Sequence, residues 1–194
     1  MNHKQKQHLL AYLGLYTGPV DGIWGEQSKA ATKAFQDRYM TGTDGIFGPN
    51  TEIKIRQVIG SGEEETPTEN FWTDIQYFCR EEFRCTCGGR GCNGFPAEPE
   101  ERLVRNAELA RIHFGSIADV SSGVRCSLRN RELPGSAANS LHLRGKAMDF
   151  RIRGVDAQTL CTYVKSLPEV DECYAIDSQF IHMGVLKTRG NENE

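Results

Sequence analysis

The stretch SLHLRGKAMDF at residues 140–150 decides how the second half of this 194-residue chain folds. From Ala147 onward the residues alternate, with Met148, Phe150 and Ile152 in one apolar row, which is the period of a half-buried strand. Asp149 belongs to the other row. The pattern therefore predicts a strand whose apolar row faces the core while the Asp149 carboxylate faces a cleft.

A second stretch, FIHMGV at residues 180–185, has the same alternation. Its buried row leaves His182 on the opposite face. If the two strands are neighbours, the side chains of His142, Asp149 and His182 converge. Two imidazoles and one carboxylate suit zinc, and three protein ligands leave a fourth position for a water molecule, as in catalytic sites. We predict that these three residues bind one zinc ion.

The residues around these ligands resemble the zinc D-Ala-D-Ala carboxypeptidase and endopeptidase family. The shared pattern is Ser-x-His-x-x-Gly-x-Ala-x-Asp, followed downstream by Phe-Ile-His, and the resemblance covers residues 71–187. The segment SGVRC at 122–126 resembles the family's Ser-Gly-Tyr-Arg. Four further residues fall where the family has an Asn and a loop of small residues: Asn130, Gly135, Ser136 and Ser140.

This resemblance implies a zinc hydrolase that cuts amide bonds in peptidoglycan peptides with a metal-activated water. It gives Arg125 the role of contacting an oxyanion or a substrate carboxylate, although a surface arginine is the alternative. Ser122 is a candidate for hydrogen bonding to substrate or only to the backbone, and Ser140 is a further candidate for substrate binding.

The general base is less directly indicated. Relatives in other branches of the family use a glutamate three residues before the last zinc histidine, where this chain has Gln179, which cannot accept a proton as a base. We therefore predict Asp177, five residues before His182, as the base. Gly184 stands where the family has an Asp that supports the histidine. A catalytically inactive wall-binding protein that keeps zinc is thus an alternative to the enzyme.

The first sixty residues contain a repeat. The unit Asp-Gly-Ile-aromatic-Gly begins at Asp21 and again at Asp44. Each Asp-Gly pair predicts a tight turn, and each Ile-aromatic pair is expected to be buried under it. We expect a helix after each unit, over residues 26–39 and 51–59, and one before Gly14. The stripes expected to be buried are Ala30, Ala31, Ala34 and Phe35 in the first of these helices and Ile55, Val58 and Ile59 in the second.

This repeat resembles the small peptidoglycan-binding domain that precedes many wall hydrolases. The resemblance implies a three-helix wall-binding module at residues 1–60. For the aromatic residues Trp24 and Phe47, packing in the interior and contact with a wall ligand both remain open.

The segment at residues 61–70 predicts a solvated linker, because it has three successive glutamates, one proline and no apolar period. Residues 71–194 then form the peptidase domain. Helices are expected over residues 98–114 and 156–167. Together with the two predicted strands, they indicate an α+β fold with an antiparallel sheet, preceded by the three-helix module.

The chain has seven cysteines, four of them crowded into residues 79–92. These four thiols, Cys79, Cys85, Cys87 and Cys92, are compatible with a second, structural metal, but reduced or partly disulfide-bonded loop thiols are the favoured interpretation. Cys126, Cys161 and Cys173 are expected to be small buried residues.

Composition narrows the biological role. The net charge of −3 and the absence of a basic stripe argue against nucleic acid as a partner, and no stretch of the sequence is long enough to insert into a membrane. Because no signal peptide is recognisable, we expect a monomeric, endolysin-like protein that is made in the host cytoplasm and acts on peptidoglycan after release, or else is secreted by a non-classical route. Wall remodelling by a D-Ala-D-Ala carboxypeptidase is the alternative. The sequence does not identify the bond that is cut.

Overall fold

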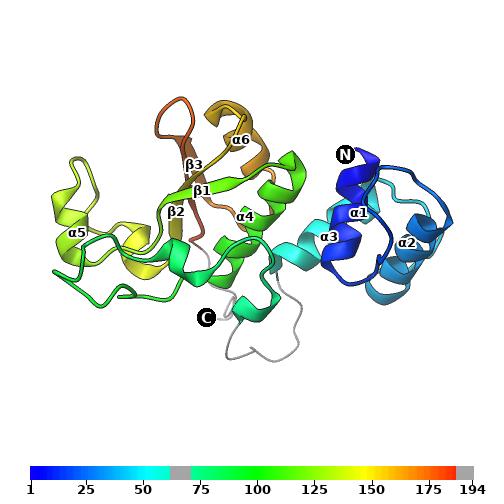
Figure 1. Cartoon of the computed structure of the whole chain (residues 1–194), viewed down its shortest axis with the longest axis horizontal. Coiled ribbons are helices and arrows are strands. Elements are labelled where there is room, and N and C mark those ends of the chain that lie inside the picture. The colour runs from blue at the N-terminus through cyan, green and yellow to red at the C-terminus, as the bar shows by residue number, and fades with distance from the viewer. Residues whose placement is uncertain (62–70, 187–194) are drawn as a thin grey trace, which may run out of the picture.

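The computed structural model describes residues 1–61 and 71–186 (Figure 1). Two groups of elements follow one another along the chain. The first is α1 (His3–Tyr12), α2 (Glu26–Tyr39) and α3 (Pro49–Ser61). The second is η1 (Phe71–Asp74), η2 (Arg80–Phe83), α4 (Glu101–Phe114), β1 (Ala118–Ser122), α5 (Ser127–Glu132), η3 (Leu141–Arg144), β2 (Ala147–Ile152), α6 (Ala157–Val164), β3 (Glu172–Ala175) and β4 (Ile181–Gly184). This confirms the predicted α+β fold with a helical N-terminal module.

A buried glutamine holds each Asp-Gly turn of the N-terminal repeat. Gln7 in α1 accepts a hydrogen bond from the backbone N–H of Gly22, and Gln36 in α2 accepts one from Gly45. Both glycines have a positive φ, 88° and 73°, which explains why glycine occupies these positions. The repeat therefore consists of two turns, each fastened to the preceding helix by an amide side chain.

The isoleucines of the repeat are not buried, contrary to prediction. Ile23 is 72% exposed and Ile46 is 66% exposed, whereas Phe47 is buried and Trp24 packs against it edge to face. The aromatic rings fill the space under the turns, so the isoleucine side chains point outward. For Phe47 this favours packing in the interior over contact with a wall ligand.

Helix α2 has the predicted bounds but buries a different stripe. Ala31 and Phe35 are buried as expected, while Ala30 and Ala34 are exposed. Three polar residues complete the buried face: Ser28, Thr32 and Gln36. Their hydrogen bonds allow burial, since Thr32 donates to the Ser28 carbonyl and Gln36 binds the second turn. In α3, the predicted residues Ile55, Val58 and Ile59 are all buried.

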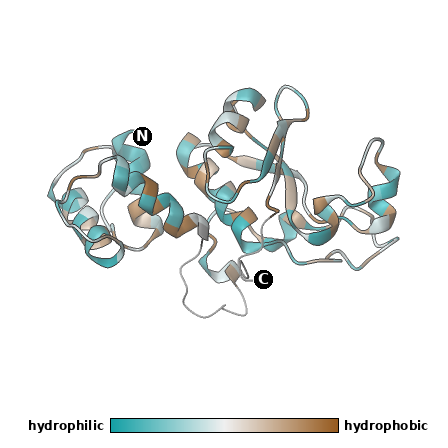
Figure 2. Cartoon of the chain, turned by 180° about the vertical axis from the view of Figure 1, so that it is seen from behind, coloured by the Kyte–Doolittle hydropathy of each residue, from teal (hydrophilic) through white to brown (hydrophobic). Residues whose placement is uncertain are grey.

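The C-terminal domain is built on a four-stranded antiparallel sheet in the order β1-β2-β4-β3. Strand β2 is central and buries the predicted row of Met148, Phe150 and Ile152 toward α4 and α6. Figure 2 shows brown, apolar residues on the strands and on the helices, α3 among them. Strands β2 and β4 are adjacent, as predicted, while β1 and β3 were not predicted.

The N-terminal module and the C-terminal domain share a packed seam. Helix α4 contacts both α1 and α3, and one continuous hydrophobic core contains Leu10 and Ile59 from the module together with Leu109 of α4. Gly60 lies so close to the C-terminal domain that a Cβ on it would lie 2.8 Å from the side chain of Pro168. Of the linker predicted at residues 61–70, residues 62–70 lie outside the described part, and the predicted domain boundaries stay a prediction.

Within residues 1–61 and 71–186, none of the helices combines the length and the apolar character needed to cross a membrane.

Candidate metal centre

A short 3-10 helix and a glycine turn place His142 beside β2. The helix η3 carries His142 in a fully buried position and ends at Gly145, which has a φ of 71°. A Cβ on Gly145 would lie 1.9 Å from the carbonyl oxygen of Glu98, so no other residue fits without moving the backbone. This explains the glycine between His142 and Asp149 in the motif.

The register of the sheet brings the other two predicted ligands together. Strands β2 and β4 pair so that Asp149 lies directly opposite His182. The Asp149 Oδ1 atom is 2.8 Å from His182 Nδ1 and 3.2 Å from His142 Nε2, and the two ring nitrogens are 3.3 Å apart. The three donor atoms thus converge on one point, as the sequence predicted.

The other nitrogen of each imidazole is held by a fixed acceptor. His142 Nδ1 lies 2.7 Å from the carbonyl oxygen of Gly123, and His182 Nε2 lies 2.9 Å from Oε1 of Glu172. When these nitrogens donate their N–H, the nitrogens that face Asp149 carry free lone pairs, which is the form that ligates a metal. The ring of Tyr174 also stacks on His182, with centroids 4.7 Å apart.

These donors fit zinc. With bonds of about 2.0–2.1 Å, tetrahedral zinc separates nitrogen and oxygen ligands by about 3.3 Å. Two of the three separations found here, 3.2 Å and 3.3 Å, are close to this value, and the third is shorter at 2.8 Å. These three atoms lie within hydrogen-bond distance of one another, and a cation placed among them could bind all three at once.

The comparisons with known proteins agree with this geometry. The family model for peptidase M15 matches residues 76–184, more than half of the chain. The chain belongs to the peptidase M15 family. A model of a peptidoglycan binding domain matches residues 3–56. Both resemblances stated from the sequence are thereby confirmed.

Two curated relatives illustrate the similarity. The zinc D-Ala-D-Ala carboxypeptidase of Streptomyces albus G is 26% identical over 76% of this chain and 54% of its own length. A protein of Haemophilus influenzae named as a probable peptidoglycan L,D-endopeptidase, MepK, is 36% identical over 41% of this chain and 40% of its own length. The M15 chain thus spans between two fifths and about half of these relatives.

Glu172 supplies the support for His182 that seemed to be missing at Gly184. Glu172 and Gly184 lie opposite each other where β3 pairs with β4. A Cβ on Gly184 would lie 2.7 Å from Cγ of Glu172 and 2.9 Å from its Oε1. The glycine therefore leaves room for a carboxylate from the neighbouring strand. This answers one of the two arguments for an inactive domain, while glutamine still stands at position 179 in place of the family's glutamate.

Arg125 lies beside the three clustered residues, and its guanidinium has two partners. Its Nη2 donates to Asp149 Oδ2 and its Nε donates to Ser122 Oγ at 2.7 Å. Burial lowers the pKa of Arg125. Ser122 thus contacts the arginine rather than only the backbone. Ser140 precedes η3, where its backbone N–H donates to the Ala137 carbonyl and its own carbonyl accepts from the N–H of Leu143. Substrate binding by Ser140 stays a prediction.

The charges of the cleft favour a cation. Burial alone would raise the pKa of Asp149, but hydrogen bonds with His142 and His182 hold it well below its usual range. Burial alone would lower the pKa of His182, but Asp149 and then Glu172 raise it instead. The carboxylates therefore place negative potential where the imidazole nitrogens meet.

Asp177 lies in the hairpin between β3 and β4, where it caps the turn. Its Oδ1 accepts hydrogen bonds from the backbone N–H groups of Gln179 and Phe180, both at 2.7 Å, and these bonds lower its pKa. Glu172, not Asp177, is the carboxylate outside the ligand set that contacts His182. Asp177 as the general base remains untested.

Proposed function

We propose that this chain is a zinc-dependent peptidase that hydrolyses amide bonds in the stem peptides or cross-links of peptidoglycan. The observation that carries the proposal is the convergence of His142, Asp149 and His182 in a buried cluster whose outer contacts leave their donor atoms free for a metal. Membership of the M15 family and the match to a peptidoglycan binding domain support it.

His142, Asp149 and His182 would hold the zinc ion. When bound, zinc supplies a Lewis acid that polarises a peptide carbonyl and lowers the pKa of a water molecule. The Gly123 carbonyl and Glu172 fix the ring orientations of the two histidines. The Arg125 guanidinium, held against the outer oxygen of Asp149, places a positive charge beside the developing negative charge on the substrate oxygen.

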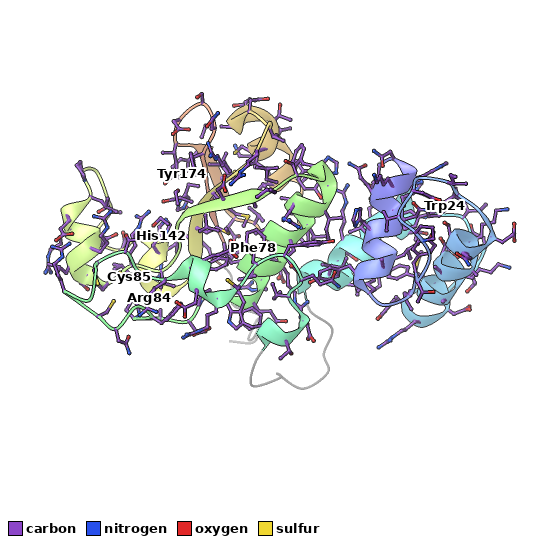
Figure 3. All side chains as sticks on the ribbon, viewed as in Figure 1. Trp24, Phe78, Arg84, Cys85, His142 and Tyr174 are labelled. Atoms are coloured by element: carbon purple, nitrogen blue, oxygen red, sulfur yellow. The ribbon has the colours of Figure 1, made fainter. Side chains whose placement is uncertain are left out.

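Tyr174 is the aromatic residue at the cleft that the sequence did not indicate. It lies opposite His182 in the sheet, stacks on its ring and remains 55% exposed, so one edge of the cluster is lined by a ring that substrate can touch (Figure 3). Its pKa is raised by burial and by the charges of Asp149 and Glu172, which keeps the hydroxyl protonated as a hydrogen-bond donor. We assign it a contact with substrate.

The helical module would anchor the peptidase to the wall. Tethering an enzyme to an insoluble polymer raises the effective concentration of the bonds it cuts. Ile23 and Ile46 occupy equivalent positions in the two repeats and expose their side chains, so they are the apolar residues of the repeat most available for wall contact.

The relatives bear names for two different reactions, a D-Ala-D-Ala carboxypeptidase and an L,D-endopeptidase. We favour an endopeptidase with an endolysin-like, bacteriolytic role, in which the protein is made in the host cytoplasm and reaches the wall after release. The pairing of a wall-binding module with a peptidase supports this role, because lysis requires bonds of the mesh to be cut. The carboxypeptidase remains the competing function.

The test uses purified peptidoglycan and the full chain. We expect the zinc-loaded protein to release new amino groups, a chelator to stop the release, and His182→Ala to lower the rate by roughly 10³-fold or more, because a ligand is lost. Mass spectrometry of the products identifies the bond. Loss of a single terminal D-Ala without a fall in wall turbidity would replace the lytic function with the carboxypeptidase.

A further inference from the structure

Four cysteine sulfurs from two separate segments meet beside the peptidase cleft. Cys85, Cys87 and Cys92 belong to the loop that follows η2, and Cys126 immediately precedes α5. Their four Sγ atoms all lie within 4.8 Å of one another. Figure 3 labels Cys85 on the same end of the molecule as His142.

The cluster differs from the one considered on sequence. Cys79 is exposed and is not a member, whereas Cys126, expected to be an isolated buried residue, is the fourth member. The exchange follows from the tertiary fold, because the backbone N–H of Val124 donates to the carbonyl of Phe83 and brings the two segments side by side. Proximity in sequence favoured Cys79, and proximity in space selects Cys126.

The spacing fits a tetrahedral metal better than disulfides. The sulfurs of Cys87 and Cys92 are 3.6 Å apart, while a disulfide has a length of about 2.05 Å. Zinc bound by four thiolates at about 2.3 Å separates the sulfurs by about 3.8 Å. Three of the cysteines are buried and Cys92 is partly buried, which shields such a centre from solvent.

The backbone around the sulfurs is shaped to enclose them. Gly88 and Gly89 have positive φ values of 63° and 81° and turn the chain between Cys87 and Cys92. A Cβ on Gly91 would lie 2.8 Å from the Cys126 sulfur.

Backbone amides are also directed at the sulfurs. The N–H of Cys126 donates to Cys85 Sγ at 3.3 Å, and the N–H of Arg129 donates to Cys126 Sγ at 3.4 Å. These N–H groups could keep donating to the two sulfurs when a metal is bound.

The loop has almost no other core. Its buried hydrophobic cluster consists of Val124 and three of the cysteines, with Cys92, Phe95 and Leu128 packed at the edge. A segment with so few apolar side chains requires another source of stability, and a metal cross-link is one that small loops commonly use.

We propose that Cys85, Cys87, Cys92 and Cys126 bind a structural zinc ion, distinct from the His142–Asp149–His182 centre. Four protein ligands leave no open position, so this ion has no direct part in hydrolysis. Arg90 and Arg129 flank the cluster, with Arg90 donating to the Cys87 carbonyl and Arg129 to the Thr86 hydroxyl. Both arginines also form ion pairs with Glu132.

The proposed ion also positions the peptidase centre. Cys126 ends the segment 122–126, in which the Gly123 carbonyl orients His142 and Arg125 contacts Asp149. The backbone N–H of Arg125 also donates to the His142 carbonyl at 3.0 Å. Fixing Cys126 therefore fixes one wall of the cleft.

The test measures the metal content of the full chain purified under reducing conditions with zinc. We expect two zinc ions per chain in the wild type, one in Cys92→Ser and two in the matched control Cys79→Ser. Cys92 is chosen because it is the least buried of the four ligands. In cobalt-substituted protein, an intense sulfur-to-cobalt charge-transfer absorption should be present in wild type and in His182→Ala but absent in Cys92→Ser.

Two results would overturn the proposal. One is a single metal per chain that His182→Ala removes, with no sulfur-to-cobalt absorption in wild type. The other is disulfide bonds among the four cysteines, detected by mass spectrometry after alkylation. Should Cys92→Ser not fold, the wild-type spectrum and the metal content of His182→Ala decide alone. Neither readout depends on peptidase activity, so failure here is distinguishable from failure of the proposed function.

Discussion

The peptidase cleft and the seam between the two modules both bury charged and polar side chains, but they satisfy them differently. In the seam, Oε1 of the fully buried Glu108 accepts hydrogen bonds from the backbone N–H groups of Gln76 and Tyr77, and Oε2 accepts one from the hydroxyl of Tyr12. Both carboxylate oxygens of Glu108 thus meet donors of the chain itself. In the cleft, two ring nitrogens and one carboxylate oxygen face one another.

The difference shows how a site can be distinguished from a structural polar cluster. Buried polar groups normally have partners, and Glu108 follows that rule. His142, Asp149 and His182 offer three metal-ligating atoms that lie within 4.8 Å of one another. Burial is common to both regions, so burial alone does not indicate function, whereas the convergence of a metal-ligating set of side chains does.

Asp177 provides the sharpest way to break this distinction. Like Glu108 in the seam, Asp177 accepts hydrogen bonds from backbone N–H groups, here those of Gln179 and Phe180 in the turn. The sequence nevertheless predicts that Asp177 is the general base. Asp177→Asn keeps an oxygen that can accept from Gln179 and Phe180, so the turn should survive. We expect zinc and wall binding to persist while the rate of amide hydrolysis on peptidoglycan falls by roughly 10²- to 10⁴-fold.

A near-normal rate for Asp177→Asn would make Asp177 a turn residue only and leave the distinction intact. The variant's zinc content and thermal unfolding serve as its controls. Unchanged values of both, together with a lower rate, separate loss of proton transfer from damage to the hairpin.

Glu172→Gln tests whether the hydrogen bond between His182 and Glu172 strengthens zinc binding. Gln keeps an acceptor for His182 Nε2 but removes the negative charge that raises the ligand's basicity. We expect zinc affinity to fall by roughly 10- to 100-fold, measured by competition with a chromophoric chelator. Glu26→Gln, which alters an exposed ion pair with Lys29 in the N-terminal module, is the matched control and should leave zinc affinity unchanged. Equal affinities for both variants would show that Glu172 does not support the ligand.

Much of the cleft could be predicted because its ligands lie on strands with a clear period of two. The alternation at residues 147–152 and 181–185 fixes which side chains share a face, and the family motif identifies the histidines. Glu172 and Tyr174 were missed because their place depends on the register of β3 against β4, which local sequence does not encode. Cys126 was missed for the same kind of reason, a long-range contact.

The N-terminal repeat shows a similar limit. The turns and helices follow from Asp-Gly pairs and apolar spacing, but the glutamines that hold the turns lie at different separations, with Gln7 15 residues before Gly22 and Gln36 nine before Gly45. A repeat search in sequence therefore does not align them. The isoleucines were predicted to be buried because they are hydrophobic, but the larger aromatic rings occupy the space under the turns.

The smallest expected effect belongs to a histidine in the seam. His113 stacks on Tyr163 with ring centroids 3.9 Å apart, and burial, reinforced by the charges of Arg56 and the N-terminus, lowers its pKa to about 4. Carboxylates raise the pKa of His182, whereas the cations near His113 act in the same direction as burial and lower its pKa. In unfolded chains a histidine has a pKa of about 6.5, so between these two values the unfolded state binds more protons than the folded state. The contribution of His113 to stability is therefore fully present above about pH 6.5 and is lost progressively as the pH falls toward 4.

We expect His113→Gln to make the unfolding midpoint in urea less dependent on pH across that window, with the hydrolysis rate at neutral pH unchanged. The difference between variant and wild type isolates His113 from the other groups that titrate there. The same pH dependence in both proteins would mean that His113 titrates alike in the folded and unfolded chain, and the seam would then not hold it in its neutral form.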